Sequence, residues 1–541
     1  MGFLKRNITY IVLAVGVVVI ANIFYVTGYR NPIAGRTYTG INIFNYADKL
    51  VYQSMVWQGS HGTIMMKNLY TSELQKGLLY SPHWWLIGET ARVFGWSIEI
   101  SMNVWRVLLG LLLVYVIYLW IKRLFIGYKA RLLALLFVSG AGTMGWWLIA
   151  GSRLLGVAIP FNGGQYPPDV VTAEIGIFSG LQQAPLVIIS HLMILLLFYL
   201  FVAWSRAWNW QRAIIWCGSL FIFLLIHPYD VLIIGTVLTI WSYWQWQEHY
   251  DRQTIWYWLT LLIGSSLAGA YLWLSLKVDP VIAGWASQNI TLTPAIGFYL
   301  FALAPYILLS FIGSIVIGRA YRHDPWWRLM LIWTWVIWII AYLPDQVSHR
   351  AVNGWLIPLS LVSMVGLLIL IRRWRGSRIK LTLVLAILVL CLGSSLYGLV
   401  FQLQSLPDVR TRESFYISDE LRQTFDVLRA TLQSGDTVLA SDQEIALMVP
   451  AYTGVPIFVA QSHQTIDYLV KDQEAKAFWV SDNNKWQRAF LQRRHITLLL
   501  IRRADHTINQ QEIKTAIGTE PILQNDAYTL YRVETASPMT D

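Results

Sequence analysis

Residues 186–204 read LVIISHLMILLLFYLFVAW, a stretch without a single Asp, Glu, Lys or Arg. An α-helix needs about 20 predominantly apolar residues to cross the ~30 Å hydrocarbon core of a bilayer. The whole chain of 541 residues is 56% hydrophobic and only 13% charged, whereas soluble domains carry about 25% charged residues. Because single soluble cores stop growing near about 250–300 residues, we expect this stretch to be one of several membrane spans.

Apolar blocks of similar length recur along the chain and predict a polytopic α-helical membrane protein with about 11 transmembrane helices. The first block follows a basic start, but it is longer than a signal-peptide core, so we expect an uncleaved span. The fifth and sixth blocks are separated by HPYD at 227–230, which predicts a tight helical hairpin. The blocks cover residues 8–27, 104–121, 132–151, 186–204, 212–227, 230–246, 255–275, 294–317, 329–343, 354–371 and 380–401.

The basic residues predict the orientation of these spans. Every second loop from the N-terminus onward is basic, as at residues 372–380, whereas the short loops between them hold only Arg153, Lys277 and Arg350. Lys and Arg gather in cytoplasmic loops, so we expect a cytoplasmic N-terminus and an extracytoplasmic C-terminus in the cytoplasmic (plasma) membrane. The net charge of +11 is therefore assigned to topology, and no nucleic-acid partner is expected.

The composition changes after residue 402, which predicts two domains. Residues 1–402 form the transmembrane domain, including a long first outer loop at 28–103, and residues 403–541 form a soluble extracytoplasmic α/β domain. Strand-like stretches such as TVLAS, GVPIFVA, HITLLLIRR and AYTLYRVE alternate with helical ones such as 484–494, which predicts a partly parallel sheet. Since no phosphate-binding glycine fingerprint occurs there, we expect an acceptor-recognition or docking module.

The first outer loop is the longest segment between spans, and long loops in compact proteins are usually functional. It contains YADKLVYQSMVWQG, which predicts an amphipathic helix along the membrane surface with Asp48 at its beginning.

The order of a first span, a long outer loop with an early acidic residue, many further spans and an outer soluble domain resembles the GT-C superfamily of membrane glycosyltransferases. These enzymes take sugars from polyprenyl-phosphate donors. The chain looks most like uncharacterised bacterial multi-span members. The similar stretches are DKLVYQSMVWQGSHG, SGAGTMGWW, HPYD, LPDQVSHRAVNGWLIPL and TVLASDQEIALMVPAYTGVPIFVAQSHQTIDY.

The resemblance implies that Asp48 is the general base, which accepts the acceptor hydroxyl proton while lipid phosphate leaves the anomeric carbon. The sequence departs from the family pattern, because Asp48 has no neighbouring second acid. From the residues alone, Asp48 could equally stabilise the amides of the first helical turn.

The leaving phosphate requires positive charge at the outer edge of the membrane. Arg350, beside His349, is the candidate phosphate contact because a guanidinium matches phosphate oxygens bidentately. Arg153 and Lys277 are alternatives, and each of these basic residues could instead reach lipid headgroups.

Three further residues are candidate substrate contacts. Glu73 could position the acceptor or a metal, or it could be a solvated loop acid. His227 and Asp230 lie in the predicted hairpin turn, where ionisable residues near bilayer depth are functional candidates. A turn held by the Asp230 side chain is the structural alternative.

A divalent cation is the one cofactor that the sequence leaves open. Asp169 and Glu174 could contribute ligands, but hard cations need several oxygens and no full set is evident, so no metal-binding residue is assigned.

The resulting hypothesis is a membrane glycosyltransferase. It transfers a sugar from a polyprenyl-phosphate donor to an acceptor hydroxyl of a glycan, lipid or protein on the outer face, in contact with membrane lipids. The absence of D-x-D and P-loop motifs favours a lipid-linked donor over a nucleotide sugar. The alternative is a lipid or polysaccharide translocator or a non-catalytic membrane assembly subunit.

Overall fold

The computed structural model describes residues 2–157, 173–249, 252–343, 348–373, 376–505, 508 and 510–533. The chain divides into two compact units. The helical unit comprises Met1–Phe24, Val104–Leu272 and Ile290–Gln404, and the α/β unit comprises Tyr25–Asn103, Trp273–Asn289 and Ser405–Asp541. The predicted first outer loop therefore groups with the C-terminal part, whereas the sequence placed it in the transmembrane domain.

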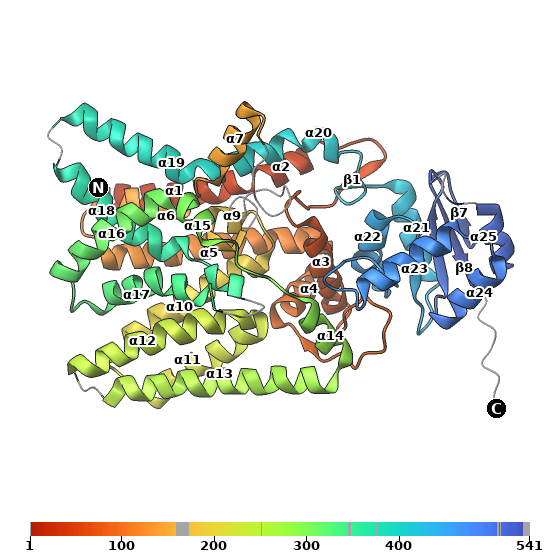
Figure 1. Cartoon of the computed structure of the whole chain (residues 1–541), viewed down its shortest axis with the longest axis horizontal. Helices are drawn as coiled ribbons and strands as arrows, with labels where there is room; N and C mark the ends of the chain where they lie inside the picture. The colour runs from red at the N-terminus through yellow and green to blue at the C-terminus, as the bar shows by residue number, and fades with distance from the viewer. Residues whose placement is uncertain are drawn as a thin grey trace. The chain divides into compact units, whose positions relative to one another are not determined.

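The helical unit is built from consecutive helices and three single-turn 3-10 helices (Figure 1). α10 packs against both α11 and α12, and α12 also packs against α17. The elements are α1 (Gly2–Ala21), α5 (Ile98–Leu124), α6 (Tyr128–Ser139), α7 (Gly145–Leu155), η1 (Ala173–Ile175), α9 (Ile177–Leu181), α10 (Pro185–Trp204), α11 (Trp210–Ile226), η2 (Pro228–Asp230), α12 (Val231–His249), α13 (Arg252–Val278), α15 (Ile296–Ala302), α16 (Ala304–Ala320), α17 (Pro325–Ile340), η3 (Ser348–Val352), α18 (Leu356–Arg373) and α19 (Ser377–Gln404).

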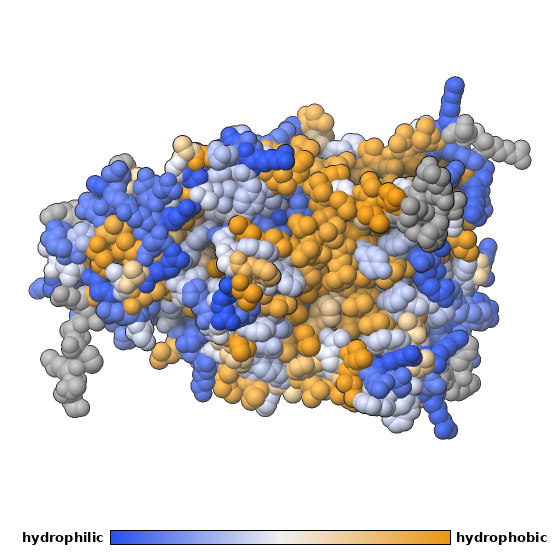
Figure 2. All heavy atoms as spheres, turned by 180° about the vertical axis from the view of Figure 1, so that it is seen from behind, coloured by the Kyte–Doolittle hydropathy of each residue, from blue (hydrophilic) through white to orange (hydrophobic). Residues whose placement is uncertain are grey.

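These helices fit a polytopic membrane protein. Among the described residues, five helical segments are long and apolar enough to cross a membrane, and the count rises to seven if each of two bent pairs is one span. The helices 210–226 and 325–340 are apolar but shorter. Exposed apolar side chains such as Leu108, Ile214 and Leu308 occur on several helices, and Figure 2 shows a broad hydrophobic surface. The count of eleven spans stays a prediction.

Small residues bring two of these helices into close contact. A Cβ atom at Gly313 of α16 would lie 2.2 Å from the Val362 carbonyl oxygen of α18, and one at Gly366 would lie 2.1 Å from the Leu309 oxygen. Such close approach of backbones is the usual packing mode of membrane helices, because lipid supplies no hydrophobic drive for their association.

The α/β unit contains a mixed four-stranded sheet of order β5-β6-β8-β7. β5 (Val438–Ala440) is parallel to β6 (Leu498–Arg502), whereas β8 (Tyr528–Arg532) is antiparallel to both β6 and β7 (Leu523–Gln524). The predicted partly parallel sheet is thus present. The stretch GVPIFVA, however, makes only an isolated bridge between Ile457 and Val438.

The rest of the α/β unit connects distant parts of the chain. β1 (Arg36–Tyr38) pairs with β4 (Tyr416–Ser418), and β2 (Met65–Met66) pairs with β3 (Leu79–Tyr80). The helices are α2 (Ile23–Arg30, which begins in the helical unit), α3 (Tyr46–Ser60), α4 (Pro82–Phe94), α14 (Pro280–Gln288), α20 (Leu406–Val409), α21 (Asp419–Ala430), α22 (Gln443–Thr453), α23 (Tyr468–Val480), α24 (Asn484–Arg493) and α25 (Gln510–Ile517).

Helix α3 corresponds to the predicted membrane-surface helix, but the structure places it in the interior of the α/β unit. It packs against α4 and α22, and its buried side chains include Lys49 and Gln58. Both polar groups are satisfied internally. Lys49 Nζ donates to the Phe44 carbonyl oxygen at 2.9 Å, and Gln58 exchanges two hydrogen bonds with the backbone of Lys67. Burial without loss of hydrogen bonds explains why a helix with so many polar residues can lie inside.

Candidate functional site

The three 3-10 helices of the helical unit gather several of the predicted residues. η3 contacts both η1 and η2, and together these turns hold Glu174, Asp230 and Arg350. The sequence assigned these residues to three separate loops. In the structure, the Arg350–Glu174 ion pair joins η3 to η1.

Arg350 is held on two sides within this cluster. Its Nη1 atom lies 3.2 Å from Glu174 Oε1, and its guanidinium carbon lies 5.7 Å from the centre of the Tyr229 ring. The side chain is 25% exposed, and its Nε atom makes no hydrogen bond to the described residues. The guanidinium is therefore fixed in position while part of the side chain stays accessible, as a contact to an anionic group requires.

Asp230 is fully buried and anchors the same cluster. Its Oδ1 atom accepts a hydrogen bond of 2.7 Å from Asn353 Nδ2, and its Oδ2 atom accepts one from the Ser190 hydroxyl. His227 Nδ1 lies 2.9 Å from Asp230 Oδ2. The Asn353 side chain also donates to Ser190. The predicted hairpin turn is thus tied by Asp230 to the turn that carries Arg350, because Asn353 N donates to the Arg350 carbonyl oxygen at 3.2 Å.

The backbone of Glu174 is fixed by two further contacts. His191 Nε2 lies 2.8 Å from its carbonyl oxygen, and Gly354 N donates to the same oxygen at 2.7 Å. His349 is buried, and its Nδ1 atom lies 3.4 Å from the Tyr299 hydroxyl. The side chain next to Arg350 in sequence therefore packs toward α15.

Arg153 occupies a different place. It lies in the last turn of α7, where its side chain is exposed, and no ion pair joins it to another described residue. The structure thus favours Arg350 over Arg153 as the ordered cation of this unit.

In the α/β unit, Asp48 lies in the first turn of α3. The preceding helix boundary, Asn45, has a left-handed backbone with φ 50°. Gln461 Nε2 donates a hydrogen bond of 3.1 Å to Asp48 Oδ1, while Gln461 Oε1 accepts one of 2.7 Å from the backbone nitrogen of His463. Gln461 is itself buried. The Asp48 carboxylate is therefore oriented by a side chain from the C-terminal segment.

Glu73 is an ion-pair partner in this structure. It pairs with Lys471 of α23, whose side chain is only 3% exposed, whereas that of Glu73 is 35% exposed. Lys471 Nζ also lies 3.3 Å from the hydroxyls of Thr71 and Ser72. Burial lowers the pKa of Lys471, although the adjacent Glu73 acts in the opposite direction.

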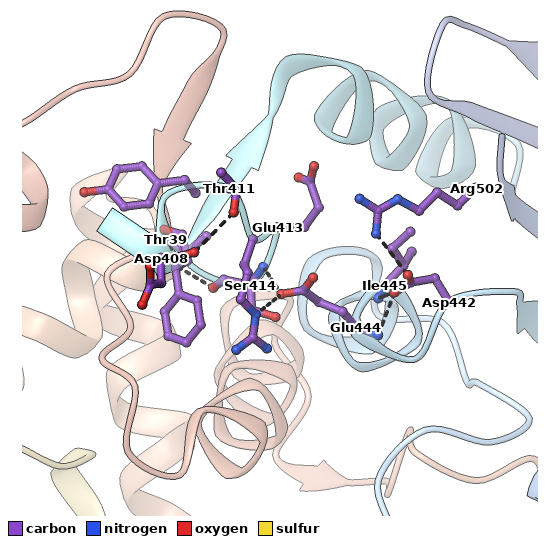
Figure 3. Close-up of polar contacts among 12 residues, drawn as sticks. Thr39, Asp408, Thr411, Glu413, Ser414, Asp442, Glu444, Ile445 and Arg502 are labelled. Atoms are coloured by element: carbon purple, nitrogen blue, oxygen red, sulfur yellow. Dashed lines mark hydrogen bonds and ion pairs between the residues drawn. The ribbon is translucent and has the colours of Figure 1, made fainter. Parts of the chain in front are cut away.

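Polar contacts around the segment that follows the last long helix support the start of α3 (Figure 3). Arg412 Nε lies 3.2 Å from Glu444 Oε1, which also accepts the backbone N–H of Ser414. The Arg412 guanidinium carbon lies 4.9 Å from the centre of the Tyr46 ring, two residues before Asp48. On the other side of α22, Arg502 pairs with Asp442 at 3.0 Å. α22 is thus held at its N-terminus by charged residues from two directions.

Sequence reasoning missed several residues of these clusters. Asn353 lies three residues after Arg350 in SHRAVNG, so one helical turn of spacing was an available signal. Gln461 and Lys471 carried no such signal, because each contacts a residue about 400 positions earlier in the chain, which only the tertiary fold brings near.

No group of three or more His, Cys, Asp or Glu side chains that could bind a metal occurs among the described residues. Glu174 is engaged with Arg350, and Asp169 lies outside the described residues.

Comparison with known proteins gives a result for the fold only. No family model and no curated protein matches the chain. Among solved structures, the oligosaccharyltransferase AglB from Archaeoglobus fulgidus, in complex with an inhibitory peptide and a dolichol-phosphate, is 10% identical with a TM-score of 0.51. This match covers 91% of the present chain and 69% of AglB. The chain has the fold of an oligosaccharyltransferase.

Two further structures of the Archaeoglobus fulgidus oligosaccharyltransferase show the same likeness. One is tethered to an acceptor peptide with an NVT sequon, at 10% identity, a TM-score of 0.51 and coverage of 91% and 69% of the two chains. The other holds Zn and sulfate, at 11% identity, a TM-score of 0.50 and coverage of 90% and 68%. All three structures share the fold with this chain at 10–11% sequence identity.

Proposed function

We propose that this protein is a GT-C-type membrane glycosyltransferase. It transfers a sugar from a polyprenyl-phosphate donor to an acceptor hydroxyl of a glycan, lipid or protein on the outer face of the cytoplasmic membrane. The observation that carries the proposal is the likeness to a glycosyltransferase fold over 91% of the chain, which includes both units. That a related structure holds a dolichol-phosphate and another an acceptor peptide supports a lipid-linked donor and an acceptor as partners.

Asp48 is assigned as the general base. Its carboxylate accepts the proton of the acceptor hydroxyl as that oxygen bonds to the anomeric carbon, while the bond from this carbon to the phosphate oxygen breaks. A positioned base typically contributes about 10²–10⁴-fold to such a rate. The hydrogen bond from Gln461 to Oδ1 orients the Asp48 carboxylate, as a positioned base requires.

Arg350 is assigned as the contact to the phosphate that leaves. The Glu174 carboxylate and the Tyr229 ring hold its guanidinium in place, and the side chain stays 25% exposed. Charge developing on the phosphate oxygens would be stabilised by such an oriented cation. The buried Asp230, with His227 and Asn353, is assigned to hold this turn. No role is assigned to a metal.

The topology that accompanies this function is a cytoplasmic N-terminus, about 11 spans and an extracytoplasmic domain from residue 403 onward that shapes acceptor access. In this scheme residues 1–402 form the transmembrane domain with its long outer loop 28–103, and residues 403–541 form the soluble domain. Residues 28–103 belong to the outer part in this scheme, which accords with their grouping in the α/β unit.

The experiment is a transfer assay on the full-length protein in lipid nanodiscs, with radiolabelled polyprenyl-phosphate sugars and a panel of glycan, lipid and peptide acceptors. Asp48→Asn keeps the size of the side chain and should lower the rate at least about 100-fold. Asp482→Asn, at an exposed position between α23 and α24, is the control and should leave the rate unchanged. An undiminished rate for Asp48→Asn removes Asp48 from the mechanism. No transfer by the natural sequence with any donor favours the translocator or assembly subunit instead.

A further inference from the structure

The α/β unit contains a cavity of about 360 Å³ that involves neither Asp48 nor Glu73. Its walls come from the end of α2, from β1, from the start of α5, and from α21 and α22. Small-molecule sites usually have volumes of about 300–1,000 Å³ and combine aromatic walls with a few polar groups. The cavity has this size, and its lining has this composition.

Four aromatic side chains line the cavity. Tyr29 is 45% exposed and meets Tyr38 edge-on, with ring centres 4.9 Å apart. Phe425 and Tyr452 form a stacked pair with ring centres 5.7 Å apart. Ring faces of this kind offer flat apolar surfaces to a ligand that has polar edges.

The aromatic walls are fixed by the protein in the absence of a ligand. Asn103 Nδ2 donates a hydrogen bond of 2.9 Å to the Tyr29 hydroxyl, and the Tyr38 hydroxyl donates one of 2.9 Å to the Ile41 carbonyl oxygen. Gly28 allows the Tyr38 ring to sit against the backbone, because a Cβ atom there would lie 2.5 Å from the ring. A preformed wall lowers the entropy that binding would cost.

The charged groups of the lining are balanced. Two carboxylates, Glu99 and Asp426, and two guanidiniums, Arg422 and Arg429, line the cavity, and Asp426 pairs with Arg429. The formal charges therefore cancel. A phosphate or carboxylate ligand would meet two acids as well as two bases, whereas a neutral ligand with many hydroxyl groups could bond to all four side chains.

A buried hydroxyl completes the set of polar groups. The Tyr452 hydroxyl lies buried beside the Glu99 carboxylate. Burial, with Glu99 close by, raises the pKa of Tyr452, so that the phenol keeps its proton at neutral pH. A ligand hydroxyl could join this pair, because the phenol oxygen can accept a hydrogen bond and the Glu99 carboxylate can accept several.

We infer that this cavity binds a neutral saccharide, with the apolar face of a sugar ring against the aromatic walls and its hydroxyls toward Glu99, Arg422 and Tyr452. The identification of this saccharide as the glycan acceptor rests on the proposed function. Binding itself does not depend on transfer.

The test is isothermal titration of the full-length protein in lipid nanodiscs with four neutral disaccharides: maltose, cellobiose, lactose and diacetylchitobiose. Glycerol 3-phosphate serves as the anionic comparison. At least one disaccharide should bind with a millimolar or lower Kd. Glu99→Gln and Tyr452→Phe change few atoms, and each should raise that Kd at least about fivefold. Lys476→Gln, at an exposed lysine of α23, is the matched control and should leave Kd unchanged.

Three outcomes would overturn the inference: no disaccharide binds at tens of millimolar, only glycerol 3-phosphate binds, or both cavity variants bind as the natural sequence does. Asp48→Asn separates this inference from the proposed function, because it should lower the transfer rate at least about 100-fold and leave disaccharide binding intact. Binding without any transfer would contradict the glycosyltransferase assignment alone. Transfer without disaccharide binding would contradict the saccharide cavity alone.

Discussion

The Gln461 side-chain amide donates a hydrogen bond of 3.1 Å to the Asp48 carboxylate, and 413 positions separate the two residues in the chain. Gln461 opens a tight turn in which its backbone oxygen accepts the N–H groups of Gln464 and Thr465. The Thr465 hydroxyl then donates to the backbone oxygen of Tyr70. The turn is therefore anchored at both ends, and Gln461 can orient Asp48 without moving itself.

The first prediction concerns Gln461 as a positioning residue. Gln461→Ala should lower kcat of sugar transfer about tenfold and change KM little, because hydrogen bonds to charged groups are worth about 1.5–3 kcal/mol and about 1.4 kcal/mol corresponds to tenfold in rate. Gln492→Ala on the exposed face of α24 is the control. A loss of thermal stability with an unchanged kcat would show that Gln461 is structural only.

A second prediction concerns the buried Asp230. Asp230→Ala leaves the donors of Ser190 and Asn353 without their acceptor, and it should cost about 3 kcal/mol of stability. Asp230→Asn keeps one oxygen for Asn353 and should cost clearly less. Thermal unfolding in detergent, followed by tryptophan fluorescence, measures both. Equal midpoints for the two variants would mean that the carboxylate oxygens do not hold this turn.

A third prediction concerns Gly454, which ends α22 with φ +70°. A Cβ atom there would lie 2.0 Å from the Trp57 ring of α3, the helix that carries Asp48. Gly454→Ala combines this clash with the left-handed backbone and should lower the free energy of unfolding by about 2–4 kcal/mol.

Gly435 provides the matched control for Gly454. Its φ is +88°, but nothing lies within 4 Å of its would-be Cβ atom. Gly435→Ala should therefore lower the free energy of unfolding by only about 1 kcal/mol, because only the left-handed backbone disfavours it. Similar losses in the two variants would show that Trp57 moves aside freely.

The fourth prediction follows from the lowered pKa of Lys471, whose main cause is burial. The folded protein releases this proton at a lower pH than the unfolded chain, for which the usual value is 10.5. Between those two pH values the unfolded state binds more protons, so the free energy of unfolding rises with pH. Below that range Lys471 carries its proton in both the folded and the unfolded state, so burial of the ammonium group lowers the free energy of unfolding by its full amount.

Lys471→Met removes this pH-dependent cost and leaves Glu73 partly exposed to water. The variant should be as stable as the natural sequence near neutral pH, or more so, because buried ion pairs are often no better than well-packed apolar side chains. The stability of the natural sequence relative to Lys471→Met should increase as the pH approaches 10.5. Unfolding midpoints of both proteins over this pH range provide the measurement, and a difference independent of pH would contradict the shift.

Much of the candidate site could be found from local sequence, but its assembly could not. The scarcity of basic residues in the short outer loops singled out Arg350, and the HPYD interruption singled out His227 and Asp230. Their mutual contacts depend on how three short turns meet, which no periodicity encodes. The burial of Lys49 and Gln58 in α3 could not be predicted, because the internal hydrogen bonds that permit it come from residues outside the helix.

The sequence by itself determined that the chain is rich in membrane-spanning helices and that strands and helices alternate near its end. Both are local properties, since hydrophobic length and the period of apolar residues are set by neighbours in the chain. Only the tertiary structure decided that residues 25–103 belong with the C-terminal part, that Gln461 meets Asp48, and that Glu174, Asp230 and Arg350 share one cluster. These contacts join segments far apart in the chain, and their free energy comes from packing and hydrogen bonds that exist only after folding.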